Sequence, residues 1–467
     1  MKLYSFKDIN NQNMALTSEQ QVVLDNVACG KNILITGGAG VGKTYLIRRI
    51  AQCDSLRNIA VTSTTGTSSI LINGTTLHAY LGIGIGTGSV EQMRSSIMKK
   101  KFLRERWQRI NILIIDEISM LTARLFDKLE ELARMVRKSN KPFGGIQLIL
   151  SGDFCQLPPI GVSSGAEEFC FEADSWNSCI GKQNVMILKT ILRQADPLFQ
   201  ETLNQLRMGI VTSDVKEVFS SCIGRKFDDP FIQPTNLFPL NRSVDEVNNK
   251  NFTKTVEDTQ HQIYEYAQEV ENSTEPMNKR TREAAIEKYK KYSIIPDQLQ
   301  LCVGCQVMLI HNLDLTDEGE KKLVNGSRGV VIKFVNDLPY IKFKNGKECV
   351  IDYHEWEIEE SDINYGKIIQ IPLRLGYAFS IHKSQGCTLD MVRLDLRNIF
   401  DYGMGYVALS RVCDLSSLSI IGIDWAGFKT HPKVIEYYNS CDGTSEDEPN
   451  IEEPDPPKAT SRLLKMK

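Results

Sequence analysis

A glycine-rich run, Gly37 to Thr44 (GGAGVGKT), constrains this chain more than any other feature. It fits the phosphate-loop pattern G-x-x-x-x-G-K-[ST], and it lies between an apolar strand, Asn32–Thr36, and a predicted helix, Tyr45–Cys53. Glycines let backbone N–H groups point at a phosphate, and the helix N-terminus adds partial positive charge. The run therefore predicts a nucleotide site. The residues expected to bind the nucleotide are Gly38, Gly40, Val41, Gly42, Lys43, Thr44 and Tyr45.

Within this loop Lys43 is expected to bridge the β- and γ-phosphates of a nucleotide, and the Thr44 hydroxyl to ligate Mg²⁺. A buried strand, Ile112–Ile115, ends in Asp116 and Glu117 at the sheet edge where ligands bind in such folds. Asp116 is expected to hold Mg²⁺ through its water shell, and Glu117 to orient and deprotonate the attacking water. Gln156, in the next loop (SGDFCQLPP), is expected to place an amide near the γ-phosphate.

Apolar strands alternate with helix-like segments over the first ~190 residues, which is typical of a parallel α/β sheet. A polar stretch, Asn248–Ser293, is predicted to hold helices and connections. From Leu301 to Ile358 short β-rich runs separated by turn signals predict a small β-barrel, and a second α/β pattern runs from Ile371 to Ser440. The predicted strands of the first part are Asn32–Thr36, Ile59–Thr62, Ile112–Ile115 and Ile146–Leu150.

Composition limits the remaining classes of protein. The 467 residues suggest about three domains, no run approaches the ~18 apolar residues of a membrane span, and the N-terminus lacks a secretory or transit signal. Twelve scattered cysteines favour a reducing compartment. The net charge of −3 gives no hint of nucleic acid, but a local groove can be basic on an acidic protein. The acidic, proline-rich end is expected to be disordered.

Eight blocks in order make the chain resemble the petite-integration-frequency (Pif-type) DNA helicases of superfamily one, from about Leu16 to Ser440. They are Leu16–Gln20, Thr62–Gly66 with Thr76–His78, Ile115–Met120, Phe143–Pro159, Phe171-Glu172 with Trp176 and Leu192–Gln194, Val324–Ser327, Ser380–Gly386 and Tyr406–Arg411. The resemblance implies an α/β fold with two RecA-like phosphate-loop domains and ATP bound between them.

The implied domains are a first RecA-like ATPase domain, 1–190, with a short wedge insert at about 86–109, and a second RecA-like domain, 191–298 plus 373–440. A small β-barrel insert occupies 299–372, and the disordered acidic tail is 441–467. The wedge rests on a basic segment with interleaved aromatics, Lys99–Trp107. The alternative interpretation of this segment is a helix whose outer face is solvated and whose other edge is buried.

The resemblance also implies roles for single residues. Gln20 lies in the adenine-reading motif, and Arg193 and Arg411 match two arginine fingers, whose planar guanidinium groups suit the charge that develops on a transferred phosphoryl group. With Lys43, Glu117 and Gln156 they complete the expected catalytic set. The residues expected near a DNA strand are Thr65, His78, Ser327, His382 and Ser384. For each of these, a structural role is the equal alternative.

The expected activity is that of an ATP-dependent, DNA-stimulated helicase that moves 5′-to-3′ on single-stranded DNA and unwinds forked duplex DNA, in genome maintenance, replication or recombination. We expect a monomer without a membrane segment, in a nucleus or in a cytoplasm or nucleoid. Two other functions stay open at this point: a nucleotide-switched DNA-binding module that does not turn over, and an ATPase that acts on RNA or protein.

Overall fold

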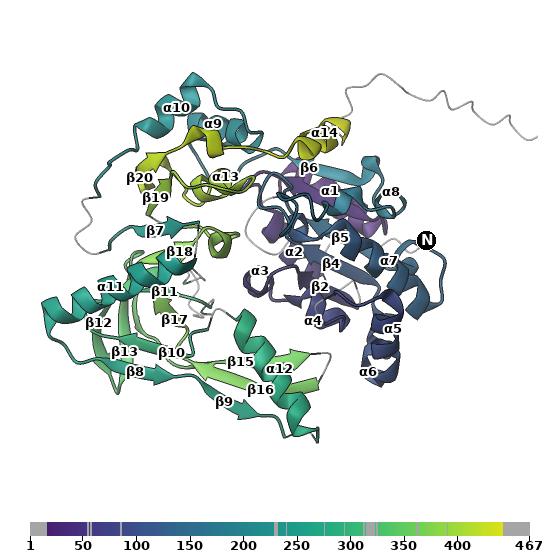
Figure 1. Cartoon of the computed structure of the whole chain (residues 1–467), viewed down its shortest axis with the longest axis horizontal. Coiled ribbons are helices and arrows are strands. Elements are labelled where there is room, and N and C mark those ends of the chain that lie inside the picture. Colours follow the sequence, from purple (N-terminus) through teal and green to yellow (C-terminus); the bar gives the residue numbers. More distant parts are fainter. Residues whose placement is uncertain are drawn as a thin grey trace, which may run out of the picture.

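The structure is a computed structural model that describes residues 16–441, apart from 54–55, 57, 85, 228–231, 240, 275, 294, 312, 314–322, 324–325, 361–362 and 390. Residues 1–15 and the tail predicted for 441–467, except Cys441, lie outside this description. Two parallel sheets and a group of antiparallel sheets build the described chain (Figure 1). A search of the described helices for one long and apolar enough to cross a membrane finds none.

The first domain is a six-stranded parallel sheet in the order β3-β2-β4-β5-β1-β6. Four of its strands match the predicted ones to within one residue at each end. The short outer strands β3 and β6 were not predicted. The strands are β1 (Ile33–Gly37), β2 (Ile59–Ser63), β3 (Thr75–Thr76), β4 (Ile112–Asp116), β5 (Gln147–Ser151) and β6 (Val185–Leu188). The helices are α1 (Ser18–Ala28), α2 (Lys43–Ala51), α3 (Gly66–Leu71), α4 (Leu77–Leu81), α5 (Val90–Lys99), α6 (Lys101–Arg109), α7 (Ala123–Arg137) and α8 (Trp176–Cys179).

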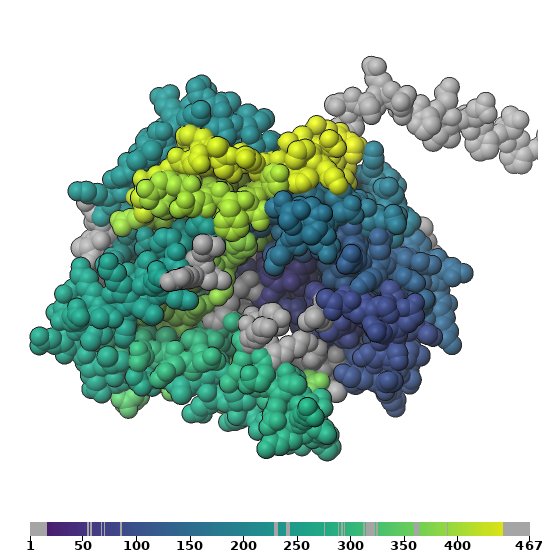
Figure 2. All heavy atoms as spheres, viewed as in Figure 1, coloured from purple at the N-terminus to yellow at the C-terminus, as the bar shows by residue number. Residues whose placement is uncertain are grey.

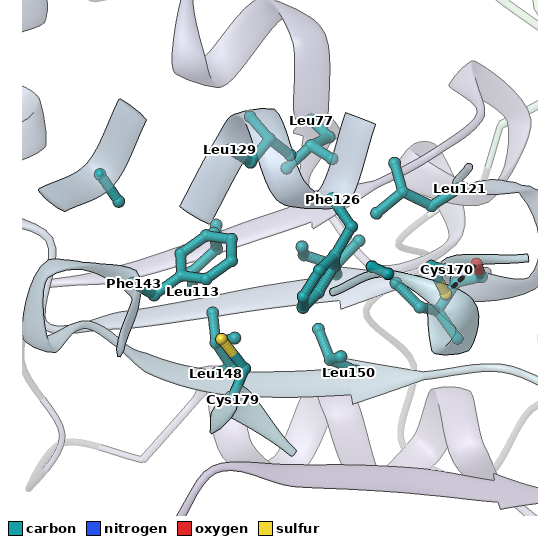
Figure 3. Packing of buried hydrophobic residues seen from close by; sticks show 14 of the residues in the cluster. Leu77, Leu113, Leu121, Phe126, Leu129, Phe143, Leu148, Leu150, Cys170 and Cys179 are labelled. Atoms are coloured by element: carbon teal, nitrogen blue, oxygen red, sulfur yellow. Dashed lines mark hydrogen bonds between the residues drawn. The ribbon is translucent and has the colours of Figure 1, made fainter. Parts of the chain in front are cut away.

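Apolar side chains fill both faces of this sheet, as the near-continuous apolar strands predict. On one face Leu113 and Leu148 pack beneath Phe126 and Leu129 of α7 (Figure 3). On the other face Ile114 and its neighbours pack with residues of α1 and α2. Because both faces of the sheet are buried, the ends of its strands are the part left open to a ligand. The phosphate loop follows the end of β1, and Asp116 and Glu117 lie at the end of β4.

The second domain is a smaller parallel sheet in the order β18-β7-β19-β20. Its strands come from both sides of the insert in the sequence, since β7 precedes the insert and the other three follow it. The strands are β7 (Thr235–Phe238), β18 (Ala378–Ser380), β19 (Val392–Leu396) and β20 (Leu418–Ile423), and the helices are α9 (Pro197–Arg207), α10 (Ser213–Ser220), α11 (Asn241–Thr259) and α13 (Met404–Leu409).

The sequence predicts a small β-barrel for the insert, and the described strands form several antiparallel sheets without a closed barrel among them. These are a five-stranded sheet, β14-β13-β12-β11-β17, a three-stranded sheet, β15-β16-β9, and a pair, β10-β8. After the three-residue strand β14 the chain leaves the first of these sheets and starts the second one. The elements are β8 (Tyr264–Ala267), β9 (Glu269–Asn272), α12 (Lys279–Tyr292), β10 (Gln298–Leu301), β11 (Gln306–Leu309), β12 (Arg328–Val335), β13 (Leu338–Phe343), β14 (Glu348–Val350), β15 (His354–Glu360), β16 (Ile363–Gln370) and β17 (Leu373–Leu375).

The insert also begins earlier than the predicted residue 299. Strand β8 pairs with β10, β9 pairs with β16, and α12 packs on β15 and β16. Residues from Tyr264 onward therefore belong with the insert and not with the second domain. These strands (YEYA and EVEN) are short and polar, so their apolar pattern is too weak to identify them from the sequence.

The last helix, α14 (Pro432–Cys441), packs on the first domain, although the sequence places 373–440 in the second. Val434 and Tyr438 belong to the core of the first domain. The ring of Tyr437 stacks on Phe171, with centroids 4.4 Å apart. Lys433 forms an ion pair with Glu172. The chain thus returns to its first domain because α14 buries aromatic rings there.

Candidate ATP site between the two parallel-sheet domains

The phosphate loop leads from β1 into α2, as predicted. Gly40 and Gly42 adopt φ of 86° and 87°, a left-handed conformation that favours glycine. A Cβ on Gly40 would lie 2.7 Å from Cβ of Arg193, and one on Gly42 would lie 2.7 Å from Nε2 of Gln20. Side chains at these two positions would therefore collide with their neighbours and fill the cradle that the backbone N–H groups offer to a phosphate.

Lys43, the first residue of α2, folds back over the loop. Its ammonium donates hydrogen bonds to the carbonyl oxygens of Gly37 at 2.7 Å and Gly38 at 2.9 Å. Burial lowers its pKa. The lysine thus lies against the loop that would receive a phosphate, where neighbouring carboxylates favour its charged form.

Asp116 and Glu117 end β4 beside this lysine. The Ser151 hydroxyl donates to Oδ1 of Asp116 at 2.7 Å, and burial raises the pKa of this carboxyl group. Glu117 adopts φ 53°, a strained conformation for a residue with a side chain. Burial first, and the charge of Asp116 second, raise the pKa of Glu117 to about 7. A carboxyl group with that pKa suits a general base near neutral pH.

Gln385 of the second domain reaches Glu117. Its Nε2 donates a hydrogen bond of 2.8 Å to Oε2 of the glutamate, and the residue is 3% exposed. Gln385 follows η6 (His382–Ser384). Gln385 lies in the block Ser380–Gly386, for which the sequence predicts a DNA contact, and its contact with the predicted base was not predicted.

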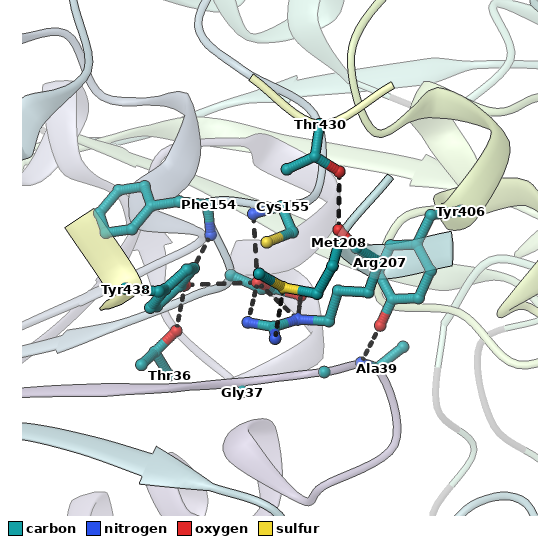
Figure 4. Close-up of polar contacts among 12 residues, drawn as sticks. Thr36, Gly37, Ala39, Phe154, Cys155, Arg207, Met208, Tyr406, Thr430 and Tyr438 are labelled. Atoms are coloured by element: carbon teal, nitrogen blue, oxygen red, sulfur yellow. Dashed lines mark hydrogen bonds and ion pairs between the residues drawn. The ribbon is translucent and has the colours of Figure 1, made fainter. Parts of the chain in front are cut away.

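Tyr406 of α13 is a second residue of this interface for which the sequence predicted no role. Its hydroxyl accepts a hydrogen bond of 2.7 Å from the backbone N–H of Ala39 in the phosphate loop, and the side chain is 3% exposed (Figure 4). Its position in the block YVALSR was the available signal. The two contacts place residues of the second domain directly on the phosphate loop and on the predicted base.

Arg411 is brought to the same interface, and its side chain is 1% exposed. It donates to the carbonyl oxygens of Val407 at 2.7 Å and Ser384 at 3.2 Å, and to Oγ of Ser410 at 2.9 Å. Burial, followed by the nearby charge of Arg193, lowers its pKa to about 10. In this arrangement the guanidinium is held mainly by backbone oxygens.

Arg193 lies in the connection between β6 and α9 and not inside the second domain. The neighbouring Leu192 donates its N–H to Gly40 O at 2.9 Å, which keeps this connection on the phosphate loop. Arg193 donates to Ser410 O at 3.0 Å, and Gln194 donates to Val412 O at 2.8 Å. Both predicted arginine fingers therefore meet next to the loop, through contacts with the segment 410–412.

Gln20 and Gln156 are buried near the loop, 2% and 6% exposed. The amide of Gln20 accepts from the N–H of Thr17 at 3.2 Å and donates to Val41 O at 3.3 Å. It therefore caps α1 and supports the loop in this structure.

The backbone N–H of Gln156 donates to Asp153 O at 2.9 Å, which closes the turn that places this side chain. Val41 is buried, and Tyr45 lies half-buried on the first turn of α2.

Three of the segments expected to contact DNA converge across the domain boundary. A Cβ on Gly386, which follows η6, would lie 2.8 Å from Cδ1 of Leu71 in α3. A Cβ on Gly326 would lie 3.5 Å from Thr388 O. The segments that carry Thr65, His382 and Ser327 are therefore neighbours, and Figure 2 shows the molecule hollowed between the first domain and the insert.

The single residues in these segments differ in accessibility. His382 is exposed, whereas Ser384 is 3% exposed and donates its hydroxyl to Ile381 O at 2.8 Å. Thr65 is half-buried and donates to Oγ of Ser68 at 2.9 Å. Ser327 and His78 are half-buried, and His78 lies on α4, where its Nε2 approaches Gly86. Their roles in DNA binding stay predictions.

The predicted wedge is the helical hairpin of α5 and α6, which packs on α7. Trp107 is fully buried and donates its Nε1–H to Leu81 O at 3.1 Å. Lys100, Lys101 and Arg104 are exposed or nearly so. The hairpin thus has one buried edge and a basic outer face, which both interpretations of this segment require, and its role as a wedge stays a prediction.

The comparisons with known proteins agree with this geometry. The family model described as PIF1-like helicase matches residues 15–214, and the model for the 2B domain of DNA helicase Pif1 matches residues 290–334. The chain is 38% identical to the ATP-dependent DNA helicase PIF1 of Xenopus laevis, over 91% of this chain and 64% of that protein. It is 33% identical to the ATP-dependent DNA helicase Pif1 of Bdellovibrio bacteriovorus, over 92% of each.

Solved structures of Pif1 helicases are also similar to this chain. The crystal structure of the Pif1 helicase from Candida albicans matches with a TM-score of 0.74 and 34% identity, over 91% of this chain and 99% of that one. The Bacteroides Pif1 helicase in complex with ADP-AlF3 and single-stranded DNA matches with a TM-score of 0.64 and 26% identity, over 92% and 97%. These likenesses span both parallel-sheet domains, which confirms the predicted α/β fold class with two RecA-like domains.

Proposed function

The chain belongs to the PIF1-like helicase family, a family of ATP-dependent DNA helicases, and we propose that it couples ATP hydrolysis between its two RecA-like domains to 5′-to-3′ movement on single-stranded DNA. The observation that carries the proposal is the pair of contacts across the cleft. Tyr406 binds the phosphate loop, and Gln385 binds Glu117. Since both partners come from the second domain, a change at the phosphates changes how the domains meet.

In the proposed reaction the phosphate loop binds ATP through its backbone N–H groups, and Lys43 leaves the carbonyl oxygens of Gly37 and Gly38 for the phosphates. Glu117 accepts the proton of the attacking water, for which its pKa near 7 is suitable. Arg193 and Arg411 exchange their backbone oxygen partners for the phosphoryl oxygens, where charge develops in the transition state. Gln156 places its amide near the γ-phosphate.

The residues at this site also fit Mg²⁺. Thr44 offers a hydroxyl on the first turn of α2, and Asp116 offers a buried carboxylate, which together are the hard oxygen donors that this cation prefers. When bound, Mg²⁺ would neutralise charge on the phosphate oxygens. Burial raises the pKa of Asp116 in this structure, so a cation would stabilise the charged form of this carboxylate.

Movement follows from the position of Gln385. This residue lies next to η6, and Gly386 touches α3 of the first domain. Opening and closing of the cleft would therefore shift η6, which carries His382, relative to α3, which Thr65 directly precedes. The direction of movement rests on the family likeness alone.

Two other functions are less well supported. A nucleotide switch without turnover would not need a buried glutamate with a pKa near 7 and two arginines at the phosphate loop. DNA is the substrate named for the relatives, and the ATPase comparison below tests it against RNA. Forked duplex as a substrate, a monomeric state, and work in a nucleus or in a cytoplasm or nucleoid follow from the proposal and stay predictions.

The test compares the ATPase rate alone, with single-stranded DNA and with RNA of the same sequence. Stimulation by DNA is expected, and equal or greater stimulation by RNA would contradict the substrate assignment. Two duplexes, one with a 5′ and one with a 3′ overhang, then test direction under single-turnover conditions. Unwinding only from the 3′ overhang would overturn the direction and leave the ATPase intact.

A further inference from the structure

Asp153 is a buried carboxylate beside the phosphate loop that the reaction outlined above does not use. It follows β5 and is 0% exposed. It accepts a hydrogen bond from the N–H of Cys155 at 3.2 Å. Among the charged groups around Lys43, Asp153 attracts the ammonium most strongly, ahead of Glu117 and Asp116. A fully buried carboxylate next to the phosphate-binding lysine needs a cationic partner of its own.

Arg207 of the second domain is that partner. It ends α9, and its Nη2 and Nε donate to Asp153 at 2.8 Å and 3.0 Å (Figure 4). Thr430 holds the backbone oxygen of Arg207 with a hydrogen bond of 2.7 Å. Burial alone would raise the pKa of Asp153, but the guanidinium charge holds it below its usual value. The ion pair therefore links the two domains at a buried point.

The C-terminal helix closes this cluster from a third direction. The hydroxyl of Tyr438 lies 2.6 Å from Oγ1 of Thr36, accepts the N–H of Phe154 at 3.1 Å, and lies 3.4 Å from Oδ1 of Asp153. The guanidinium of Arg207 lies 5.0 Å from the centroid of the Tyr438 ring. Thr36 directly precedes the phosphate loop, so three chain segments hold Asp153 at the base of that loop.

Lys43 and Arg207 approach the same glycine. The ammonium of Lys43 donates to Gly38 O at 2.9 Å, and a Cβ on Gly38 would lie 3.6 Å from Cδ of Arg207. Two cations thus flank one loop residue, and among the described contacts of the carboxylate of Asp153 the charged partner at hydrogen-bond distance is Arg207. Removal of the Arg207 charge would leave Lys43 as the nearby cation able to neutralise Asp153.

We propose that Arg207 is a positioning residue of the ATP site: by occupying Asp153 from the second domain, it keeps the Lys43 ammonium available for the phosphates of ATP. The inference rests on the proposed nucleotide binding and adds a residue to it. Arg207 acts through Asp153, and its contribution falls on nucleotide affinity more than on the chemical step. It also makes the affinity for ATP depend on the position of the second domain.

The experiment measures the dissociation constant of a fluorescent ATP analogue by titration of the full chain, with melting temperature as a second readout. Arg207→Met is expected to weaken binding about tenfold, the effect of a coupling between charges in contact. Arg207→Lys keeps a cation and should stay within about threefold of the parent. Asp153→Asn with Arg207→Met should restore binding to within about threefold, because no carboxylate is left to hold Lys43.

The matched control is Arg134→Met, which leaves Glu130 as a buried carboxylate on α7, where it accepts the N–H of Phe143 at 3.4 Å. Arg134 donates to Glu130 at 2.8 Å, and the side chain of Glu130 is 7% exposed. The control should lower the melting temperature without changing the affinity for the analogue. A similar loss of affinity in the control would overturn the inference, because it would reflect a general effect of an unpaired carboxylate.

Two further results would contradict the inference: unchanged affinity in folded Arg207→Met, or a loss that Asp153→Asn does not relieve. If Arg207→Met does not fold, the double variant Asp153→Asn with Arg207→Met decides the question. A loss of affinity for the analogue of about tenfold or more in the double variant would contradict the inference, because that variant has no carboxylate at position 153 to hold Lys43. The titration requires no turnover. A parent chain that binds nucleotide but lacks DNA-stimulated hydrolysis would contradict the proposed function and leave this inference testable, whereas a parent chain that binds no nucleotide would contradict both.

Discussion

The amide of Gln385 donates a hydrogen bond of 2.8 Å to the carboxylate of Glu117, and the two residues lie 268 positions apart in the sequence. This bond joins the predicted base of the first domain to the segment of the second domain that is expected to contact DNA. It stabilises the charged form of Glu117 and so opposes the effect of burial on its pKa. The predicted chemistry and the domain interface therefore share one carboxylate.

This bond predicts a shift in the pH profile. Glu117 must be deprotonated to act as a base, so kcat should rise with pH through about 7, the pKa that burial gives this group. Gln385→Leu removes the donor that favours the carboxylate, and the midpoint should move to higher pH. Initial ATPase rates between pH 5.5 and 9 with saturating single-stranded DNA measure the shift. An unchanged or lower midpoint would show that Gln385 does not act on Glu117.

Glu117→Gln should separate binding from turnover. The amide keeps the shape of the side chain but cannot accept the proton of water, so ATP and single-stranded DNA should bind while hydrolysis stops. Binding titrations and single-turnover hydrolysis measure the two steps. Glu91→Gln, at an exposed helix position, is the control. Loss of nucleotide binding in Glu117→Gln would mean that Glu117 supports the structure and is not the base.

Lys43→Ala should abolish ATP hydrolysis and leave the fold intact, because the ammonium is the cation placed directly on the phosphate loop. DNA-stimulated ATPase activity and circular dichroism measure the two effects. Lys216→Ala removes an exposed lysine of α10 and should change neither. Stimulated activity within tenfold of the parent would contradict the assignment of the phosphate loop.

Arg193→Ala and Arg411→Ala should each leave ATP affinity within about tenfold and reduce turnover by roughly 10³, the lower range for arginine fingers. Both guanidinium groups are held by oxygens of the chain in this structure and are expected to turn to the phosphates only with ATP bound. Arg397→Ala serves as the control, because it removes an exposed arginine that is paired with Asp395. Near-normal turnover in either variant removes that residue from the catalytic set.

Binding of single-stranded DNA should weaken steeply with salt although the net charge is −3. A groove that neutralises several phosphates releases about 0.7 counterion for each phosphate contact on a single strand. Fluorescence anisotropy of a labelled oligonucleotide at several salt concentrations gives the slope. A flat response would mean that the strand is held mainly by stacking of its bases.

The sequence alone determined the parts of this protein that depend on residues close together in the chain. The phosphate loop needs a strand, glycines at positive φ and a helix within about twenty residues, and β1, Gly40, Gly42 and α2 provide them. Apolar runs determined four strands of the first sheet, because burial on both faces requires such runs. The order of the family blocks determined the fold class.

Only the tertiary structure decided which distant residues meet. Tyr438 lies next to Thr36 across 402 residues of sequence, and no periodicity predicts that α14 returns to the first domain. The short polar strands β8 and β9 pair with β10 and β16, partners distant in sequence, and their own residues carry little signal. The contacts of Tyr406 with Ala39 and of Arg207 with Asp153 exist because helices α13 and α9 of the second domain pack against the phosphate-loop side of the first, and a pattern read along the chain contains no information on that packing.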